Sequence, residues 1–139
     1  RQRQMCIRDS IYAFANATVP KVNLIVEDAI GSAYIAMNSK ATGADVVYAW
    51  PTAKVGMMDA ASAVKIMYAD EIESGDATEV IAEKTAEYQN LQGSVMSAAA
   101  RGYVDSIVEP VDTRKYIIGA FEMLYTKFED RPGKKHGTV

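Results

Sequence analysis

The fold is decided by a stretch that reads PKVNLIVEDAIGSAY over residues 20–34. Its first part, Lys21–Val26, is a short and nearly continuous apolar run rich in β-branched residues, which is typical of a buried strand. Gly31-Ser32-Ala33 then predicts a turn into a helix that runs towards Lys40. Gly43 is placed to cap the C-terminal end of that helix. A buried strand followed by a small-residue turn and a helix indicates the beginning of an α/β fold.

The rest of the chain continues this alternation of strands and helices. Further strands are predicted at residues 46–49, 54–58 and 103–108. Further helices are predicted at residues 60–69, 77–91, 95–100 and 112–127, with a polar connection at 71–76. Asp59 is a good N-cap for the first of these, and Ile117, Phe121, Leu124 and Tyr125 are expected to face the core from the last. Such alternation implies βα crossover units and an α/β core.

Composition and charge exclude several classes of protein. The chain has 139 residues, enough for one domain with a core, and its 15 Lys and Arg against 18 Asp and Glu give a formal charge of −3. An acidic balance does not favour nucleic-acid binding. One Cys and one His exclude a disulfide framework and a Cys/His zinc cluster from this chain alone, and we predict no metal site. No apolar run approaches the ~20 residues that cross a bilayer, so we expect a soluble, cytoplasmic domain.

Residues 1–10 differ from the chain that follows. They are polar and basic, and Met5–Asp9 is what ATGTGTATAAGAGAC encodes, a string within a transposon-end adapter used to build sequencing libraries. We interpret this segment as non-native and adapter-derived, which leaves residues 11–139 as the native chain, with part of a domain at 11–130 and a tail at 131–139. Cys6 then carries no native chemistry, and removing three Arg and one Asp changes the formal charge to −5.

Gly31-Ser32-Ala33 is the first place where chemistry is expected. The first N–H groups of a helix have no intrahelical acceptor, so the amides of Ser32 and Ala33 are candidate donors of an oxyanion hole. From the spacing alone, an ordinary tight turn in which Gly31 only permits the bend is the favoured interpretation, because Gly-Ser-Ala is a weak signal. Ser32 is not favoured as a nucleophile, because no His lies near it in sequence and the pattern Gly-x-Ser-x-Gly is absent.

Two further segments allow both a functional and a structural interpretation. The aromatic residues of Tyr48–Thr52 and the pair Met57-Met58 are candidates for the wall of an apolar ligand pocket, or for core packing. Arg101–Asp105 is a candidate anion or acid–base site, but a structural ion pair and a turn are favoured. His136 lies in a Lys-rich tail and is expected to be solvated.

Several separated motifs resemble one family in the same order along the chain. They read ATVPKV (17–22), GSAY (31–34), MNSK (37–40), GAD (43–45), AWPTA (49–53), AAARGYVD (98–105), IVEP (107–110), DTR (112–114) and RPGKKHG (131–137). The family is that of the biotin-dependent carboxyltransferase subunits, which includes propionyl-CoA carboxylase β chains and methylmalonyl-CoA decarboxylase α subunits. The resemblance runs from about Ile11 to the end of the chain.

The resemblance implies a crotonase-like α/β fold of ββα units, of which this chain is part of the C-terminal domain. It implies movement of a carboxyl group between N1′ of biotin and the α-carbon of an acyl-CoA. Backbone amides supply the oxyanion holes of such enzymes, and Gly31, Ser32 and Ala33 match the one near the biotin ureido oxygen. A second set of residues is expected to line the substrate and biotin pocket. This set is Tyr34, Ile35, Trp50, Pro51, Met57 and Met58.

The same resemblance implies cofactors and partners. Biotin is carried on a separate carrier, the coenzyme A thioester is the substrate, and the subunit is a homo-oligomer. The expected partners are a biotin carboxyl carrier protein and either a biotin carboxylase or a membrane decarboxylase subunit. The alternatives are the α subunit of a sodium-pumping decarboxylase and a non-catalytic assembly module. Because such active sites form between two subunits and two domains, we expect no carboxyl transfer by the 139-residue chain alone.

The chain departs from the family pattern near the candidate site. Glu27 and Asp28 stand where many members have a basic pair, and Ser32 replaces a glycine. Serine keeps the backbone amide, so the expected donor survives. Two acids in place of bases weaken any local electrostatic attraction for carboxybiotin or for CoA phosphates.

The interpretation of residues 1–10 is tested by sequencing the genomic locus. We expect the native codons upstream of Ile11 to differ from the adapter string and to encode an additional part of the protein. A genomic read that shows the codons of residues 1–10 in continuous native context would contradict this interpretation.

Overall fold

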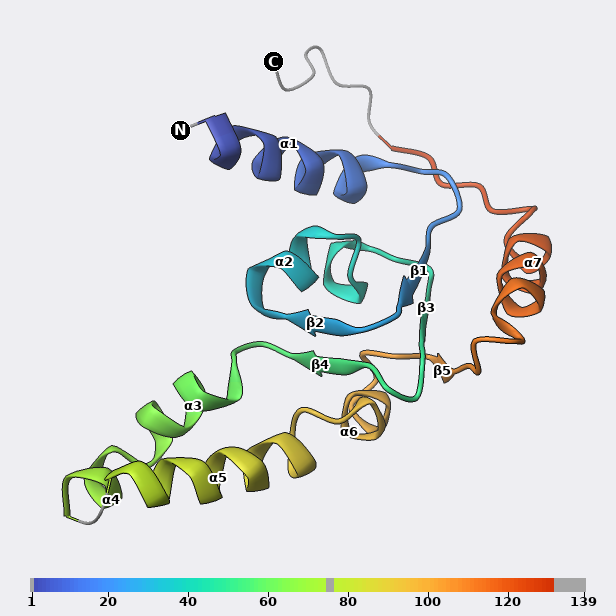
Figure 1. Cartoon of the computed structure of the whole chain (residues 1–139). Helices are drawn as coiled ribbons and strands as arrows, with labels where there is room; N and C mark the ends of the chain where they lie inside the picture. The colour runs from blue at the N-terminus through green and yellow to red at the C-terminus, as the bar shows by residue number, and fades with distance from the viewer. Residues whose placement is uncertain (1, 75–76, 132–139) are drawn as a thin grey trace.

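The fold is seen in a computed structural model, which describes residues 2–74 and 77–131 (Figure 1). The strands are β1 (Val22–Ile25), β2 (Asp28–Ile30), β3 (Val46–Ala49), β4 (Lys54–Gly56) and β5 (Ser106–Ile107). The helices are α1 (Gln2–Asn16), α2 (Gly31–Ala36), α3 (Ala60–Met67), α4 (Ala69–Ser74), α5 (Ala77–Leu91), α6 (Val95–Ala100) and α7 (Thr113–Met123), with a 3₁₀ turn η1 (Lys40–Thr42). Among these helices, none combines the length and apolar character needed to span a membrane.

Two small parallel sheets form the centre of the molecule. β3 lies between β1 and β5 in the first sheet, and β2 pairs with β4 in the second. The register places Ile25 opposite Ala49 in the first sheet and Ile30 opposite Gly56 in the second. Parallel neighbours require crossover connections, and α2 with η1 supplies one while α3 to α6 supply another. The α/β core expected from the sequence is confirmed.

The core surrounds β3. Val47 and Ala49 of this strand are fully buried, and residues from both sheets and from two helices pack around them. Among those residues are Ile25 of β1, Val55 of β4 and Val95 of α6. The helices α3, α4 and α5 extend away from this centre, whereas α7 lies on the opposite side, beside β1 (Figure 1).

The orientation predicted for the last helix is wrong at two positions. Phe121 is 46% exposed and Tyr125 is 87% exposed. The residue of α7 that reaches the core is Ala120, and the ring of Tyr116 meets that of Tyr48 edge-on at 5.7 Å between centroids. A small side chain at the point of contact lets α7 approach the sheet closely, which leaves the larger residues beside it facing outwards.

Four other details of the sequence prediction need correction. β2 was not predicted, and the helix after Gly31 ends at Ala36 rather than running towards Lys40. Gly43 caps the 3₁₀ turn η1 instead, with a φ of +95° that suits a glycine. The polar connection predicted at 71–76 overlaps α4, which is helical to Ser74. The predictions for α5 and α6 are confirmed residue for residue, as is the N-cap of Asp59, whose side chain accepts the N–H of Ser62.

A group of charged residues ties the end of the chain to its beginning. The Asp45 carboxylate accepts one hydrogen bond from the Lys127 ammonium, at 2.9 Å, and another from the backbone N–H of Lys21, at 2.7 Å. The buried Lys21 ammonium donates to the carbonyl of Phe14 in the last turn of α1, at 2.8 Å. Burial opposes ionisation of Asp45, but the two lysines outweigh it and hold the pKa of its carboxyl below the ordinary value. Asp45 therefore joins α1, β1 and the segment after α7.

Replacing Asp45 by Asn tests this connection. We expect a loss of about 2 kcal/mol in the free energy of unfolding, as for other hydrogen bonds to charged groups. Because the pKa of Asp45 is lowered on folding, its contribution is present above the unfolded-state pKa and is lost as the pH falls towards the folded-state value. Urea unfolding at neutral pH and in acid should show the difference between wild type and Asp45→Asn shrink in acid.

The exposed Asp130 provides the matched control, since Asp130→Asn removes a carboxylate outside this group. We expect that variant to unfold like the wild type at both pH values. A deficit for Asp45→Asn that is the same in acid as at neutral pH would show that the carboxylate charge is not what stabilises the fold.

Candidate functional site

The turn between β2 and α2 carries the strongest functional prediction, and the structure explains its sequence. Gly31 has a φ of +71°, in the left-handed region that favours glycine. A Cβ added there would lie 3.7 Å from the carbonyl oxygen of Met57, an ordinary contact, so backbone conformation rather than space requires the glycine. The pairing of Ile30 with Gly56 brings Gly31 and Met57 side by side from segments far apart in sequence.

The first turn of α2 contains the two predicted backbone donors. Ser32 and Ala33 are both exposed, and the first amides of a helix have no intrahelical acceptor. The N-cap residue, Ile30, makes no side-chain cap hydrogen bond to them. The arrangement of two neighbouring N–H groups at an accessible turn can bind a carbonyl oxygen or an oxyanion.

A cleft of about 310 Å³ lies beside this turn. We call it the β2 cleft, and its lining consists of residues 23–30 with Ala33, Tyr34 and Met37. Glu27 and Asp28, the two acids that depart from the family pattern, are exposed at its edge. The carboxylate of Asp28 lies 3.9 Å from the ammonium of Lys54, in an exposed pair that neutralises little of this charge. The β2 cleft thus has an acidic rim, and of the two proposed donor residues Ala33 lines it.

The structure brings three of the predicted pocket residues to this region. Met57 and Met58 follow β4 and are exposed, and Met57 lies against Gly31. Tyr34 is 8% exposed and lines both the β2 cleft and a smaller pocket that it shares with Met57. Burial in the first place, and the nearby phenol of Tyr103 in the second, raise the pKa of the Tyr34 hydroxyl, which therefore stays protonated at neutral pH.

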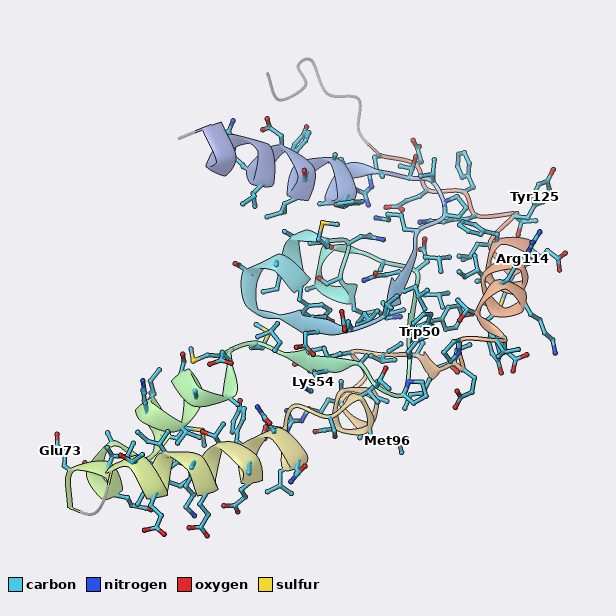
Figure 2. All side chains as sticks on the ribbon, in the orientation of Figure 1. Trp50, Lys54, Glu73, Met96, Arg114 and Tyr125 are labelled. Carbon is cyan, nitrogen blue, oxygen red and sulfur yellow. The ribbon has the colours of Figure 1, made fainter. Side chains whose placement is uncertain are left out.

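Other predicted pocket residues lie elsewhere. Ile35 is half-buried and packs against the core. The indole N–H of Trp50 donates to the hydroxyl of Thr113 at 2.9 Å, which directs this side chain towards the start of α7 (Figure 2). Pro51 follows Trp50 and is exposed. Trp50 and Pro51 are therefore not brought together with Met57 and Met58.

The segment Arg101–Asp105 has the structural role that was favoured for it. Gly102 turns the chain with a φ of +79°. Asp105 forms an ion pair with Lys40 and accepts the N–H of Val47 at 2.8 Å, so it fastens β5 to the central strand. Arg101 donates to the side-chain oxygen of Gln92 at 2.7 Å. His136 lies outside the described residues.

Sequence reasoning missed how Arg101 and Tyr103 relate to Tyr34. These three residues line one small pocket together with Tyr88 and Gln92, although α5 and the turn after α6 are far from Tyr34 in sequence. No local spacing signals such a meeting, because it depends on how α5 and α6 pack against β4.

The fold is that of an α/β domain, and the predicted site lies at its exposed turn between β2 and α2. The chain belongs to the carboxyl transferase domain family, which matches residues 7–139. This match begins inside the segment 1–10. The family and the crotonase-like fold implied by the resemblance are both confirmed.

Curated relatives extend this finding. The chain is 49% identical over 130 residues to a "putative propionyl-CoA carboxylase beta chain" of Bacillus subtilis (strain 168), covering 93% of this chain and 26% of that protein. It is 45% identical over 130 residues to "methylmalonyl-CoA decarboxylase subunit alpha" of Propionigenium modestum, covering 93% of this chain and 25% of that protein. The chain therefore spans about a quarter of the length of the curated relatives it matches.

A solved structure agrees with the fold closely. The transcarboxylase 12S subunit, described as a hexamer with methylmalonyl-coenzyme A bound, superposes with a TM-score of 0.90 at 42% identity. The superposition covers 97% of this chain and 26% of that one. The β subunit of geranyl-CoA carboxylase from P. aeruginosa matches with a TM-score of 0.71 at 28% identity, over 96% of this chain and 25% of that one.

The conformation of Gly31 gives a direct test of the turn. Gly31→Ala forces a Cβ into the left-handed region, and we expect it to lower the free energy of unfolding by about 1–2 kcal/mol. Gly119→Ala is the matched control, because Gly119 lies within α7 with open space around its Cα. Alanine is the better helix former, so this control should raise stability by about 0.5–1 kcal/mol. Chemical unfolding of both variants measures the contrast, and a loss of the same size in both would contradict the role assigned to Gly31.

Proposed function

We propose that this chain is part of a carboxyltransferase that moves a carboxyl group between carboxybiotin and the α-carbon of an acyl-CoA such as propionyl-CoA or acetyl-CoA. The observation that carries the proposal is the first turn of α2, where Gly31 has a positive φ and the residues Ser32 and Ala33 that follow it are exposed. Membership of the carboxyl transferase domain family and the names of the relatives support it.

The turn fits the carbonyl of a ureido ring. Biotin, when bound, supplies the ring nitrogen that carries the transferred carboxyl group. Negative charge that develops on the ureido oxygen during transfer would be stabilised by the Ser32 and Ala33 amides, which need no reorganisation because the turn already holds them. Backbone donors of this kind do not titrate, so their contribution should not depend on pH near neutrality.

The surroundings of the turn suggest how the substrate is held. Met57 and Met58 offer exposed apolar surface next to Gly31, and Tyr34 borders the β2 cleft directly after the proposed donors. In this proposal these three side chains line the pocket for the acyl group or the biotin ring. Ile35 packs against the core rather than into this pocket, and Trp50 and Pro51 lie towards the start of α7, so none of these three is part of the proposed pocket.

The proposed partners follow from the chemistry. A biotin carboxyl carrier protein delivers the carboxyl group, and homo-oligomerisation completes the site. A biotin carboxylase serves the carboxylating direction, whereas a membrane decarboxylase subunit serves the reverse direction named for the Propionigenium relative. The proposed location is the cytoplasm, peripheral to a membrane in the second case.

A chimera tests the proposed role of the amides. Residues 11–139 of this chain replace the matching part of the transcarboxylase 12S subunit of Propionibacterium freudenreichii, to which the chain is 44% identical over 128 residues. Ser32→Pro in the chimera removes one N–H at a position in the first helical turn, where proline is tolerated. We expect carboxyl transfer from methylmalonyl-CoA to fall by about 100-fold or more, as when other oxyanion-hole donors are removed.

Ala61→Pro is the matched control, since Ala61 occupies the same position in the first turn of α3. That variant should keep the activity of the parent chimera. Full activity in the Ser32→Pro chimera, with the control behaving as expected, would refute the oxyanion role.

A further inference from the structure

The helix α7 carries a groove that the proposed chemistry does not use. This helix packs against β1 and lies at the edge of the molecule (Figure 1). The groove has a volume of about 800 Å³, and its lining consists of Tyr48 of β3, Val111 and residues 114–116, 118–120 and 122–123. We call it the α7 groove. None of the described residues that line it belongs to the β2 cleft, so the two spaces are separate.

Large apolar side chains of the α7 groove face solvent. Val111, Ile118 and Met123 are all exposed, Val111 almost completely. The helix makes its core contact through Ala120, and these three side chains do not take part in the described core. Contiguous apolar surface that is left in water marks a site of interaction with another molecule.

Gly119, in the middle of α7, is not explained by the described fold. A Cβ built on it would meet no atom within 4 Å, and its φ lies outside the left-handed region, so neither space nor backbone conformation requires a glycine. Glycine also weakens the interior of a helix relative to alanine. What its missing side chain provides is a place beside the groove where the backbone of another helix can come close.

The charges beside the groove are complementary to a reversed copy of themselves. Lys115 and Glu122 stand seven residues apart, about two helical turns, so they share one face of α7 with Gly119 between them. Both are exposed, and within residues 2–74 and 77–131 neither forms an ion pair. When an identical helix runs in the opposite direction, Lys115 of each helix meets Glu122 of the other. Such a two-fold contact is isologous, with every pair formed twice.

We propose that the α7 groove is the contact between two copies of this chain, in which α7 packs antiparallel against α7 of the partner subunit with Gly119 at the crossing point. The apolar side chains supply the buried surface, because ion pairs at the rim of a contact contribute little by themselves. The two Lys115–Glu122 pairs fix the direction and the register. The proposal names a surface for the homo-oligomer of the proposed function, and only in that respect does it rest on that function.

Sedimentation equilibrium of the 139-residue chain, from micromolar to millimolar concentrations, measures this association. We expect a reversible equilibrium between monomer and dimer. Lys115→Glu and Glu122→Lys each place like charges opposite one another twice in a dimer, and each should weaken dimerisation by about tenfold or more. The variant with both changes restores the two pairs with their signs exchanged, and it should associate like the wild type. An equimolar mixture of the two single variants should form the mixed dimer for the same reason.

Gly119→Gln tests the crossing point. Glutamine favours a helix but places a long side chain where the two backbones approach, so we expect dimerisation to weaken by about tenfold or more. The two charge reversals put an acid in the first turn of α7 and a base in its last turn, which favours the helix, and circular dichroism checks that all variants stay folded. Glu83→Lys is the matched control, because it reverses an exposed charge in α5, and it should dimerise like the wild type.

Three results would each overturn the proposal. A chain that stays monomeric at millimolar concentration would leave the face to the rest of a longer polypeptide. A dimer that the variants of Lys115, Glu122 and Gly119 do not weaken would use another surface. A double variant that stays as weak as the single ones would contradict the antiparallel pairing. Because sedimentation does not require turnover, failure here leaves the chimera test unaffected.

Discussion

The central position of β3 is the constraint on which the rest of the structure depends. Its backbone pairs in parallel with β1 on one side and β5 on the other, and Val47 and Ala49 are fully buried between the surrounding elements. Parallel pairing requires each neighbour to enter from the same end, so the chain must cross over between strands. Those crossovers contain α2 and the helices α3 to α6, and the turn of the candidate site lies at the start of α2. The site residues are therefore fixed indirectly, through the sheet.

The polar contacts of this chain reinforce the same topology. Asp105 binds Lys40 and the amide of Val47, which fastens the last strand to the middle one. Asp45 performs a corresponding task at the same end of β3, where it joins the start of β1 to the segment after α7. Both carboxylates act on the backbone ends of strands rather than in a cleft. That placement explains why acidic residues in this chain serve structure, while the proposed chemistry relies on amides.

The sequence predicted the elements whose signals are local and missed those that depend on distant partners. Asp59 and Ser94 cap α3 and α6 through their own side chains, so these helices begin where spacing indicates. β2 is only three residues long, begins with the acid Asp28 and follows the acid Glu27, and it becomes a strand because β4 pairs with it. The inward face of α7 was assigned to large side chains, yet Ala120 makes the contact, because close approach to the sheet selects a small residue.

The candidate site also has one part that the sequence predicts and another part that depends on distant partners. Gly31 is recognisable from the sequence, because a positive φ at a strand-to-helix turn favours glycine. The amides of the next two residues belong to the first turn of the predicted helix. Tyr34, Arg101 and Tyr103 line one pocket because α6 packs against β4. The spacing of residues along the sequence does not predict this proximity.

Tyr34 lines both the β2 cleft and the smaller pocket that it shares with Met57, and it directly follows the two proposed donors. Any shift of its ring alters the shape of both spaces at once. The burial of Tyr34 therefore matters beyond the core. Because its ring is held in one position, the shape of the β2 cleft and that of the smaller pocket are fixed together.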